Sequence, residues 1–339
     1  MTLTARIAQI SSYLPTTILH NDELAEIYPG WSSDKIYQKT GIVTRHIASA
    51  LETSSDLAFG AAQKLFESNS ASPTDIDFVI FCTQTPDYFL PTTACLLQTR
   101  LGIPTTAGAF DLNLGCSGFV YGLSIAKGLI ETGAAHKLLF LTADTYSKII
   151  HPLDKSVRTL FGDGATATLI EACDRSSECI GPFLFGTDGR GADNLIVEAG
   201  GFRFPHSVAT AQEKTDESGN VRSQDHLFMN GSEIMAFTLS TVTKAIKEFL
   251  LKVNASIDDF DHIVMHQANR FMLDALRKKL KIPEEKFPVF LEDCGNVSSS
   301  TIPITLESMF NKNCINPNDR LLLVGFGVGY SLAVTEIKF

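Results

Sequence analysis

A cysteine between two glycines is the residue of this chain best suited to nucleophilic chemistry. Cys116 stands in the run Gly-Cys-Ser-Gly at 115–118, after an apolar stretch of strand length and before a helical pattern. The flanking glycines permit a tight turn and close approach of a substrate. Free N–H groups and the positive dipole end at a helix start stabilise a thiolate, the reactive form of cysteine. Cys116 is therefore a candidate nucleophile, and the alternative is a buried, inert thiol.

Two further polar residues have the right chemistry to assist such a nucleophile. His266 follows the apolar run 263–265, and the carboxyl ends of strands are where open α/β sheets carry their sites. Asn296 lies in a Gly-Asn-Val-Ser run just before a helical pattern. Taken alone, a histidine in this setting is more often structural, and an asparagine more often belongs to a turn or helix cap.

An internal repeat favours functional roles for His266 and Asn296, because it relates the part of the chain that holds them to the part that holds Cys116. At a nearly constant offset, residues 71–80 match 255–264, 101–104 match 280–283, 110–116 match 290–296, and 138–141 match 321–324. The repeat indicates a duplicated αβ unit, whose equivalent strand ends face each other across a pseudo-twofold axis. It pairs Cys116 with Asn296 and Cys82 with His266. The duplication thus predicts that these side chains converge on one cavity.

Strand and helix patterns alternate in both halves, and this alternation predicts the elements that position the site. Strands are expected at 78–82, 107–112, 137–142, 165–170, 263–266, 287–290, 321–324 and 332–337. Helices are expected at 91–101, 119–130, 271–280 and 301–310. Sheets packed between helices follow from this order, so the fold class is α/β, two duplicated αβ halves in a five-layered αβαβα stack. The halves are predicted at 1–172 and 173–339, with the polar stretch 202–225 as a surface insertion.

Composition limits the classes of function. The 339 residues are 44% hydrophobic with a net charge of −10, which argues against a general nucleic-acid or anionic-membrane binder. The seven cysteines form neither CxxC pairs nor a Cys/His cluster, so we expect thiols in a reducing compartment and no metal site. The first residues are expected to form a strand, and the apolar run 321–334 is too short and glycine-rich to span a bilayer. A cytoplasmic protein is expected.

At these residues the chain resembles the thiolase superfamily, and within it the β-ketoacyl-acyl-carrier-protein synthase III family, enzymes that start fatty-acid chains. The matching segments run in the right order from about position 30 to the end: 39–42 with 45–48, 161–165, 186–189, 191–193, 199–201 and 325–329. The resemblance implies a thiolase-like fold, a homodimer and an acyltransferase. It also implies that no cofactor stays bound.

The resemblance implies a role for each candidate residue. Cys116 resembles the acyl-accepting nucleophile, and His266 and Asn296 resemble the pair that binds the extender thioester. The backbone N–H groups of Cys116 and Val328 would hold the oxyanion. The implied reaction forms an acyl-cysteine from an acyl-CoA, followed by a decarboxylative Claisen condensation with malonyl-acyl-carrier protein. Both substrates are phosphopantetheine-linked thioesters.

Further residues are implied to bind CoA or phosphopantetheine: Lys39, Lys155, Phe161 and Asn269. The two lysines stand where the family commonly has arginine, and Lys35 stands where it commonly has tryptophan. Lysine keeps the charge but cannot stack on adenine, which leaves the donor open between CoA-linked and carrier-linked acyl groups. Leu90 matches a residue that reaches across the dimer to close the acyl pocket, and leucine there could admit chains longer than acetyl.

Basic residues after His266 are candidates for docking an acidic carrier protein: Arg270, Arg277, Lys278 and Lys279. The competing interpretation is an ordinary solvated helix face. Three other functions stay open: a same-fold ketosynthase or acyltransferase of a specialised polyketide or secondary-metabolite pathway, a Cys-His-Asn thioester hydrolase, and a silent partner subunit. The last would be expected to lack Cys116, His266 or Asn296, and all three are present.

Overall fold

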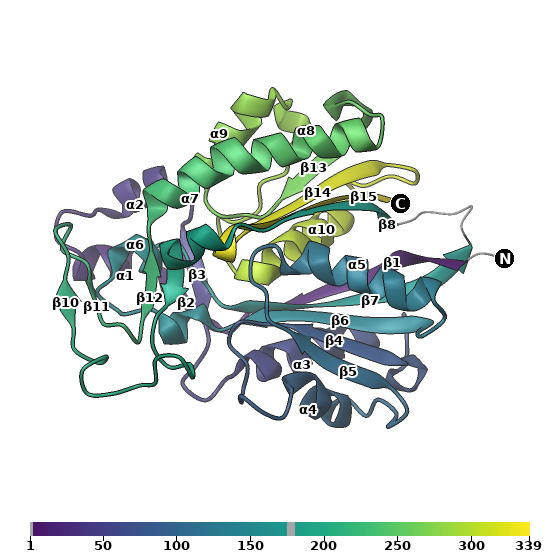
Figure 1. Cartoon of the computed structure of the whole chain (residues 1–339), viewed down its shortest axis with the longest axis horizontal. Helices are drawn as coiled ribbons and strands as arrows, with labels where there is room; N and C mark the ends of the chain where they lie inside the picture. Colours follow the sequence, from purple (N-terminus) through teal and green to yellow (C-terminus); the bar gives the residue numbers. More distant parts are fainter. Residues whose placement is uncertain (1–2, 175–179) are drawn as a thin grey trace.

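Two mixed sheets and three layers of helices alternate in the computed structural model, which describes residues 3–174 and 180–339 (Figure 1). Two helices lie between the sheets, and further helices cover each outer face. These helices are α3 (Ser54–Glu67) and α4 (Thr93–Arg100) on one face, α5 (Gly118–Glu131) and α10 (Thr301–Asn311) in the middle, and α8 (Thr243–Lys252) and α9 (Arg270–Leu280) on the other face. The predicted five-layered α/β stack is confirmed.

The sheet of the N-terminal half has the strand order β1-β7-β6-β4-β5. The strands are β1 (Leu3–Tyr13), β4 (Phe78–Cys82), β5 (Gly108–Leu112), β6 (Lys137–Asp144) and β7 (Gly164–Asp174). β4 pairs in parallel with β5 and β6, whereas β7 runs antiparallel to both β6 and β1. β5 is an edge strand, and its carboxyl end leads into the segment that holds Cys116.

The sheet of the C-terminal half repeats this pattern in the order β13-β14-β15-β8. The strands are β8 (Ile180–Gly186), β13 (His262–Met265), β14 (Arg320–Gly327) and β15 (Ser331–Lys338). β13 and β14 are parallel, and the other neighbours are antiparallel, as for the equivalent strands β4, β6, β7 and β1. A serine capping box precedes β4 at Ser72 and β13 at Ser256, so the repeat extends to local hydrogen bonds. The division at 1–172 and 173–339 stays a prediction.

The core between the sheets is built from one apolar face of α5 and one of α10. On α5, Phe119, Leu123 and Ala126 recur at helical spacing and are fully buried. The ring of Phe119 stacks on that of Phe140 in β6, with ring centroids 5.6 Å apart. The same apolar cluster includes Val264 of β13, so both sheets pack against one layer of helices. This shared core fixes the strand ends of the two halves relative to each other.

Two predicted elements differ from the structure. Residues 287–290 do not form a strand, because Pro288 has no N–H and the N–H of Phe290 donates instead to the Gln267 side chain at 2.9 Å. The helix expected from position 91 begins at Thr93. Its start is fixed by the Asp111 carboxylate, which accepts the backbone N–H groups of Thr93 and Ala94.

The remaining elements gather mainly at one end of the stack, on the left of Figure 1. They are β2 (Thr17–His20), α1 (Asn21–Ile27), α2 (Ser33–Thr40), β3 (Thr44–Ile47), α6 (Lys155–Arg158), β9 (Leu195–Val197), β10 (Lys214–Thr215), β11 (Val221–Arg222), β12 (Leu227–Met229) and α7 (Gly231–Phe237). The stretch 202–225 is mostly exposed and carries the β10–β11 hairpin, as predicted for an insertion.

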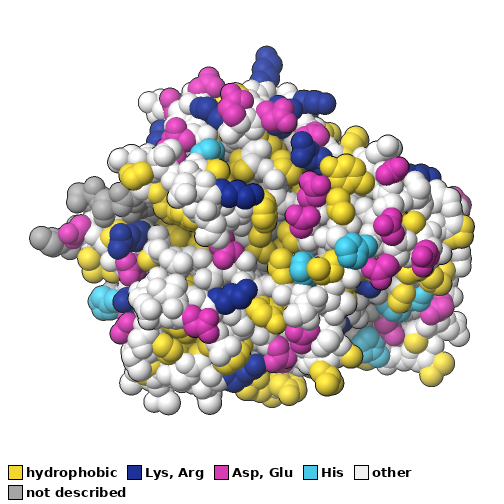
Figure 2. All heavy atoms as spheres, turned by 180° about the vertical axis from the view of Figure 1, so that it is seen from behind, with side chains coloured by type: hydrophobic (Ala, Val, Ile, Leu, Met, Phe, Trp, Pro, Cys, Tyr) yellow, Lys and Arg dark blue, Asp and Glu magenta, His cyan; other side chains and the backbone are white. Residues whose placement is uncertain are grey.

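The distribution of charge on the surface and the lengths of the helices can both be read from the structure. On the face in Figure 2, lysine and arginine side chains are scattered among acidic ones. Within residues 3–174 and 180–339, no helix combines the length and the apolar character needed to cross a bilayer.

Candidate active site

Cys116 lies where the sequence predicted, after β5 and directly before Ser117, the N-cap of α5. Only 5% of its surface is exposed. The end of β14 covers the sulfur so closely that a Cβ atom on Gly327, the last residue of this strand, would lie 2.8 Å from Sγ. Gly327 is therefore required for this approach, because any side chain would collide with the nucleophile.

The electrostatics of the thiol differ from the expectation of a resting thiolate. Burial raises the pKa of Cys116 to about 12, and the negative charge of the Asp144 carboxylate adds to the rise. The backbone N–H groups of Cys116 and Val328 act on the sulfur in the opposite direction, but more weakly. Burial therefore outweighs the stabilisation expected from the helix start and favours the neutral thiol. The structure does bring the two predicted oxyanion-hole N–H groups to the reacting atom.

His266 follows β13 directly and is buried, with 2% of its surface exposed. Its Nδ1 lies 2.7 Å from the hydroxyl oxygen of Thr301, the first residue of α10. Burial lowers the pKa of the imidazole to about 3, so the ring is neutral over the physiological range. The ring of Phe326 contacts it edge to face at 5.7 Å.

Asn296 is held by backbone hydrogen bonds that join the two halves. Its N–H donates to the carbonyl of Leu160 at 2.9 Å, and its carbonyl accepts from the N–H of Gly162 at 3.0 Å. The side-chain oxygen Oδ1 accepts the backbone N–H of Ser298 at 2.9 Å. With its oxygen bound in this way, the amide of Asn296 has its NH₂ group left as a donor.

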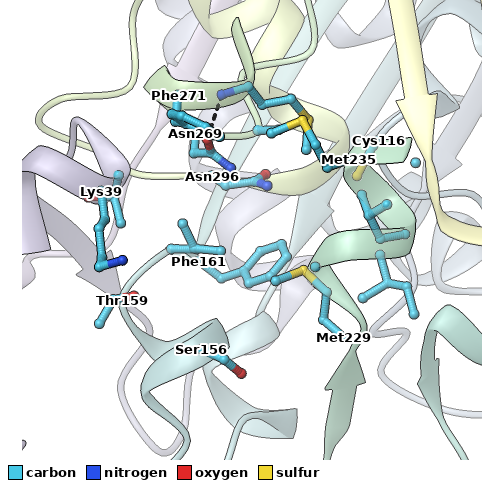
Figure 3. Close-up of a pocket in the computed structure, with 18 of the residues that line it drawn as sticks. Lys39, Cys116, Ser156, Thr159, Phe161, Met229, Met235, Asn269, Phe271 and Asn296 are labelled. Carbon is cyan, nitrogen blue, oxygen red and sulfur yellow. Dashed lines mark hydrogen bonds between the residues drawn. The ribbon is translucent and has the colours of Figure 1, made fainter. Parts of the chain in front are cut away.

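These three side chains line one cavity of about 430 Å³. Figure 3 shows Lys39 and Cys116 at opposite sides of the view, with Asn296 and Phe161 between them. Most of the other wall residues are apolar, among them Leu195, Met229, Ile234, Met235 and Phe326. The structure therefore brings together three of the four residues that the repeat predicted to converge, within a largely apolar wall. The fourth, Cys82, does not line the cavity, because its thiol packs against Gly118 and donates to the carbonyl of Leu114.

The four residues predicted to bind CoA or phosphopantetheine line the same cavity: Lys39, Lys155, Phe161 and Asn269. Phe161 stacks on Tyr146 with ring centroids 5.0 Å apart. The side-chain oxygen of Asn269 accepts the N–H of Met272 and caps α9, so its amide NH₂ group remains as a donor. The ammonium of Lys155 donates to the carbonyl of Ser218 in the insertion.

The residues predicted for the acyl pocket and for carrier docking lie outside the cavity. Leu90 is 81% exposed and does not line the cavity of its own chain. Of the four basic candidates on α9, Arg270 pairs with Asp274 on the same helix at 3.3 Å. Arg277 lies 3.9 Å from Glu284. These contacts offset part of the positive charge, and the exposed Lys278 and Lys279 carry the rest.

Among the lining residues that the sequence reasoning did not single out, Trp31 has the most evident chemistry. Trp31, the single tryptophan of the chain, lines the cavity and is partly exposed. The ammonium groups of Lys35 and Lys39 lie 5.3 Å and 5.6 Å from its ring centroid. The resemblance implied a tryptophan at position 35, where the chain has lysine, whereas the tryptophan of this chain lies at position 31, just before α2.

Comparison with known proteins agrees with this site. Residues 110–189 match the family model 3-oxoacyl-[acyl-carrier-protein] synthase III, and residues 250–339 match the model of its C-terminal part. A β-ketoacyl-[acyl-carrier-protein] synthase III of Caldanaerobacter subterraneus subsp. tengcongensis is 36% identical over 99% of this chain and 98% of that protein. The chain belongs to the β-ketoacyl-[acyl-carrier-protein] synthase III family.

Solved structures of synthase III proteins also share its fold. One crystal structure of a 3-oxoacyl-(acyl-carrier-protein) synthase III is 59% identical, with a TM-score of 0.98 over 99% of this chain and 100% of that chain. A 3-oxoacyl-(acyl-carrier protein) synthase from Burkholderia xenovorans LB400 is 37% identical, with a TM-score of 0.90 over 99% and 95%. Like its relatives, this synthase III is an acyl-transferring condensing enzyme. In the described residues, no group of three or more His, Cys, Asp or Glu is arranged to hold a metal ion.

Proposed function

We propose that this synthase III starts acyl chains by loading an acyl group from acyl-CoA onto Cys116 and condensing it with malonyl-acyl-carrier protein. The observation that carries the proposal is the single cavity lined by Cys116, His266 and Asn296, contributed by both halves. A nucleophile and two neutral donors facing one chamber are what an acyl transfer followed by a decarboxylation requires.

In the first step the sulfur of Cys116 attacks the thioester carbonyl of the acyl-CoA. The carbonyl oxygen becomes an oxyanion, which accepts hydrogen bonds from the N–H groups of Cys116 and Val328. The carbon–sulfur bond to CoA then breaks, and the proton lost by Cys116 ends on the released CoA thiol. Because burial favours the neutral thiol, Cys116 gives up its proton as its sulfur bonds to the carbonyl carbon, where the oxyanion that forms is held by the two N–H groups.

In the second step the malonyl thioester replaces CoA. The Nε2–H of neutral His266 and the NH₂ group of Asn296 donate to its thioester carbonyl. The bond to the carboxylate breaks, CO₂ leaves, and the resulting enolate is stabilised by the same donors. Its carbon attacks the acyl-cysteine, which releases the ketoacyl product and returns Cys116. A neutral imidazole suits this step, because it donates to the enolate without pairing with the departing carboxylate.

The mouth of the cavity supports CoA as the first donor. Lys39 and Lys155 line the cavity and would pair with the phosphates of CoA, and the ring of Trp31 would stack on adenine. Trp31 supplies the planar surface that lysine at position 35 lacks. Asn269 offers its amide to the phosphopantetheine arm, and Phe161 lines the same passage.

A homodimer and an acidic carrier protein are the proposed partners. The edge strand β5 has unpaired backbone groups on one side, and Tyr88, Phe89 and Leu90 form an exposed apolar group beside Phe202, whose ring lies 5.7 Å from that of Phe89. A second copy covering this face would bury both, and Leu90 would then close the acyl pocket of the partner. The carrier would dock on the basic residues of α9. The protein would act in the cytoplasm.

Intact-protein mass spectrometry tests the proposal. The protein is incubated with a series of acyl-CoAs and acyl-carrier proteins, and malonyl-carrier protein is then added. We expect acyl mass on the wild type and none on Cys116→Ala, followed by release of a ketoacyl product and CO₂. Trp31→Ala should need more acyl-CoA for the same loading while acyl-carrier loading is unchanged. Hydrolysis of the acyl-enzyme without a ketoacyl product, or acyl mass retained on Cys116→Ala, would refute the proposed function.

A further inference from the structure

The second step requires a particular protonation of His266, and one neighbouring hydroxyl decides whether it is available. A neutral imidazole carries its proton on Nδ1 or on Nε2, and the nitrogen without the proton accepts a hydrogen bond. For Nε2–H to donate into the cavity, Nδ1 must accept from a donor inside the protein. The groups that face Nδ1 therefore determine the tautomer.

Two groups face the ring at this position. The Thr301 hydroxyl oxygen lies 2.7 Å from Nδ1 and can donate or accept. A backbone group of Ser298 raises the pKa of the ring, which is the effect of a carbonyl that accepts from it, and this carbonyl lies 3.1 Å from the hydroxyl that contacts Nδ1. A carbonyl can only accept, so it favours a proton on Nδ1. The backbone N–H of Ser298, which could have served as a donor, is bound to Oδ1 of Asn296 at 2.9 Å. Among the described residues, the Thr301 hydroxyl is thus the donor available to Nδ1.

The hydroxyl has a single proton and two acceptors within reach. Its second acceptor is the carbonyl of Ser298, at 3.1 Å. That carbonyl already receives the backbone N–H of Thr301 at the end of the turn 298–300, so it does not depend on the hydroxyl. When the hydroxyl turns to Nδ1, the proton of the ring must lie on Nε2. When it turns to Ser298, Nδ1 carries the proton and Nε2 cannot donate.

We propose that Thr301 is a positioning residue that makes the Nε2–H tautomer of His266 available for the condensation. This inference rests on the proposed function, because it assigns the orientation of a donor used in the second step. The turn 298–301 then orients both donors of the site: Ser298 fixes the amide of Asn296, and Thr301 fixes the imidazole of His266. Ser298 adopts a left-handed backbone conformation with φ of 51°, which places its N–H and carbonyl for these two tasks.

The substitution Thr301→Val tests this assignment because valine keeps the shape of the side chain and removes the donor. Nδ1 would then face only the Ser298 carbonyl, so the proton should move to Nδ1. We expect the condensation rate to fall by about 10²–10³, the loss expected for one such donor, with Cys116 acylation unchanged. Thr301→Ser should restore the rate. Thr305→Val, a buried threonine one turn further along α10 whose hydroxyl donates to the carbonyl of Thr301, is the matched control and should keep the wild-type rate.

A spectroscopic measurement separates tautomer selection from simple damage to the fold. The protein has eight histidines, so ¹⁵N-histidine labelling gives a spectrum in which His266→Ala identifies the signals of His266. With an unreactive malonyl thioester analogue bound, the wild type should show the proton on Nε2 and Thr301→Val should show it on Nδ1. A wild type protonated on Nδ1, or a Thr301→Val protein that keeps both the Nε2 proton and the condensation rate, would overturn the inference. Absence of any condensation by the wild type would instead refute the proposed function, and the tautomer readout would still stand.

Discussion

The two halves of this enzyme place different side chains at the same point of a repeated fold. Cys82 ends β4 in the N-terminal half, and His266 follows β13 in the C-terminal half. The thiol of Cys82 donates to the carbonyl of Leu114 at 3.0 Å, and a Cβ atom on Gly118 would lie 2.4 Å from its sulfur. His266 instead lines the cavity. Duplication thus supplies two equivalent strand ends. Packing against α5 buries Cys82 at one of them, whereas His266 at the other faces the cavity.

The segments that lead to Cys116 and Asn296 also differ, with a regular strand in the N-terminal half and an irregular segment in the C-terminal half. In the N-terminal half, β5 is a regular strand that leads directly to Cys116. In the C-terminal half, the equivalent residues 287–290 are irregular and their backbone is held by Gln267. The loop that follows carries Asn296, which is joined to residues 160–162 of the other half. Loss of the strand frees this segment to cross between the halves, while the intact strand holds the nucleophile in place.

The largest expected effect is on the condensation rate, and it should follow the loss of His266 or Asn296 but not the loss of Cys82. Replacing His266 or Asn296 by alanine removes one donor to the malonyl carbonyl, so the condensation rate should fall by about 10²–10³. Loading of Cys116 should continue, because its oxyanion is held by backbone N–H groups. Single-turnover loading and steady-state condensation measure the two steps separately. A loss of loading equal to the loss of condensation would show that the two halves do not divide the reaction in this way.

An intermediate effect concerns the thiol itself. Because burial and Asp144 raise the pKa of Cys116 to about 12, the thiolate fraction is small at neutral pH and grows as the pH rises towards that pKa. Alkylation by iodoacetamide should therefore accelerate about tenfold per pH unit between roughly pH 7 and 10, without a plateau.

Asp144→Asn removes the negative charge, so it should lower the pKa of Cys116 and raise the alkylation rate at pH 8 several-fold. Asn is the conservative choice, since the Asp144 carboxylate accepts from the N–H of Gln84 and the hydroxyl of Ser299. Mapping of the alkylated peptide by mass spectrometry identifies the modified cysteine. A plateau near pH 8 in the wild type would mean that the thiol is activated in the resting enzyme.

The smallest expected effect is that of replacing Cys82, the buried counterpart of His266. Cys82→Ala removes a buried sulfur that does not line the cavity, so the free energy of unfolding should fall by about 1 kcal/mol. Condensation should stay close to the wild-type rate. Urea denaturation at fixed protein concentration and the steady-state assay check the two statements. A large loss of condensation with an unchanged unfolding midpoint would place Cys82 in the active site and remove the contrast with His266.

Much of the fold followed from local patterns. Continuous apolar runs predicted β4, β6 and β14, and helical spacing predicted α5, α9 and α10, because each buries a whole face or stripe against its neighbours. The prediction failed at 287–290, where a proline and a side-chain acceptor from Gln267 compete with strand pairing. Trp31 was missed because its place beside the cavity depends on how α2 packs against the rest of the molecule.

The sequence by itself determined the duplication, the order of the elements, and the residue types at equivalent positions of the two halves. These depend on patterns along the chain, which are fixed by covalent order. Only the tertiary structure decided the charge state of Cys116, the bonding of Asn296 and the partner of His266. Those properties depend on burial and on groups remote in sequence such as Asp144, and proton affinity is set by what surrounds a side chain in space.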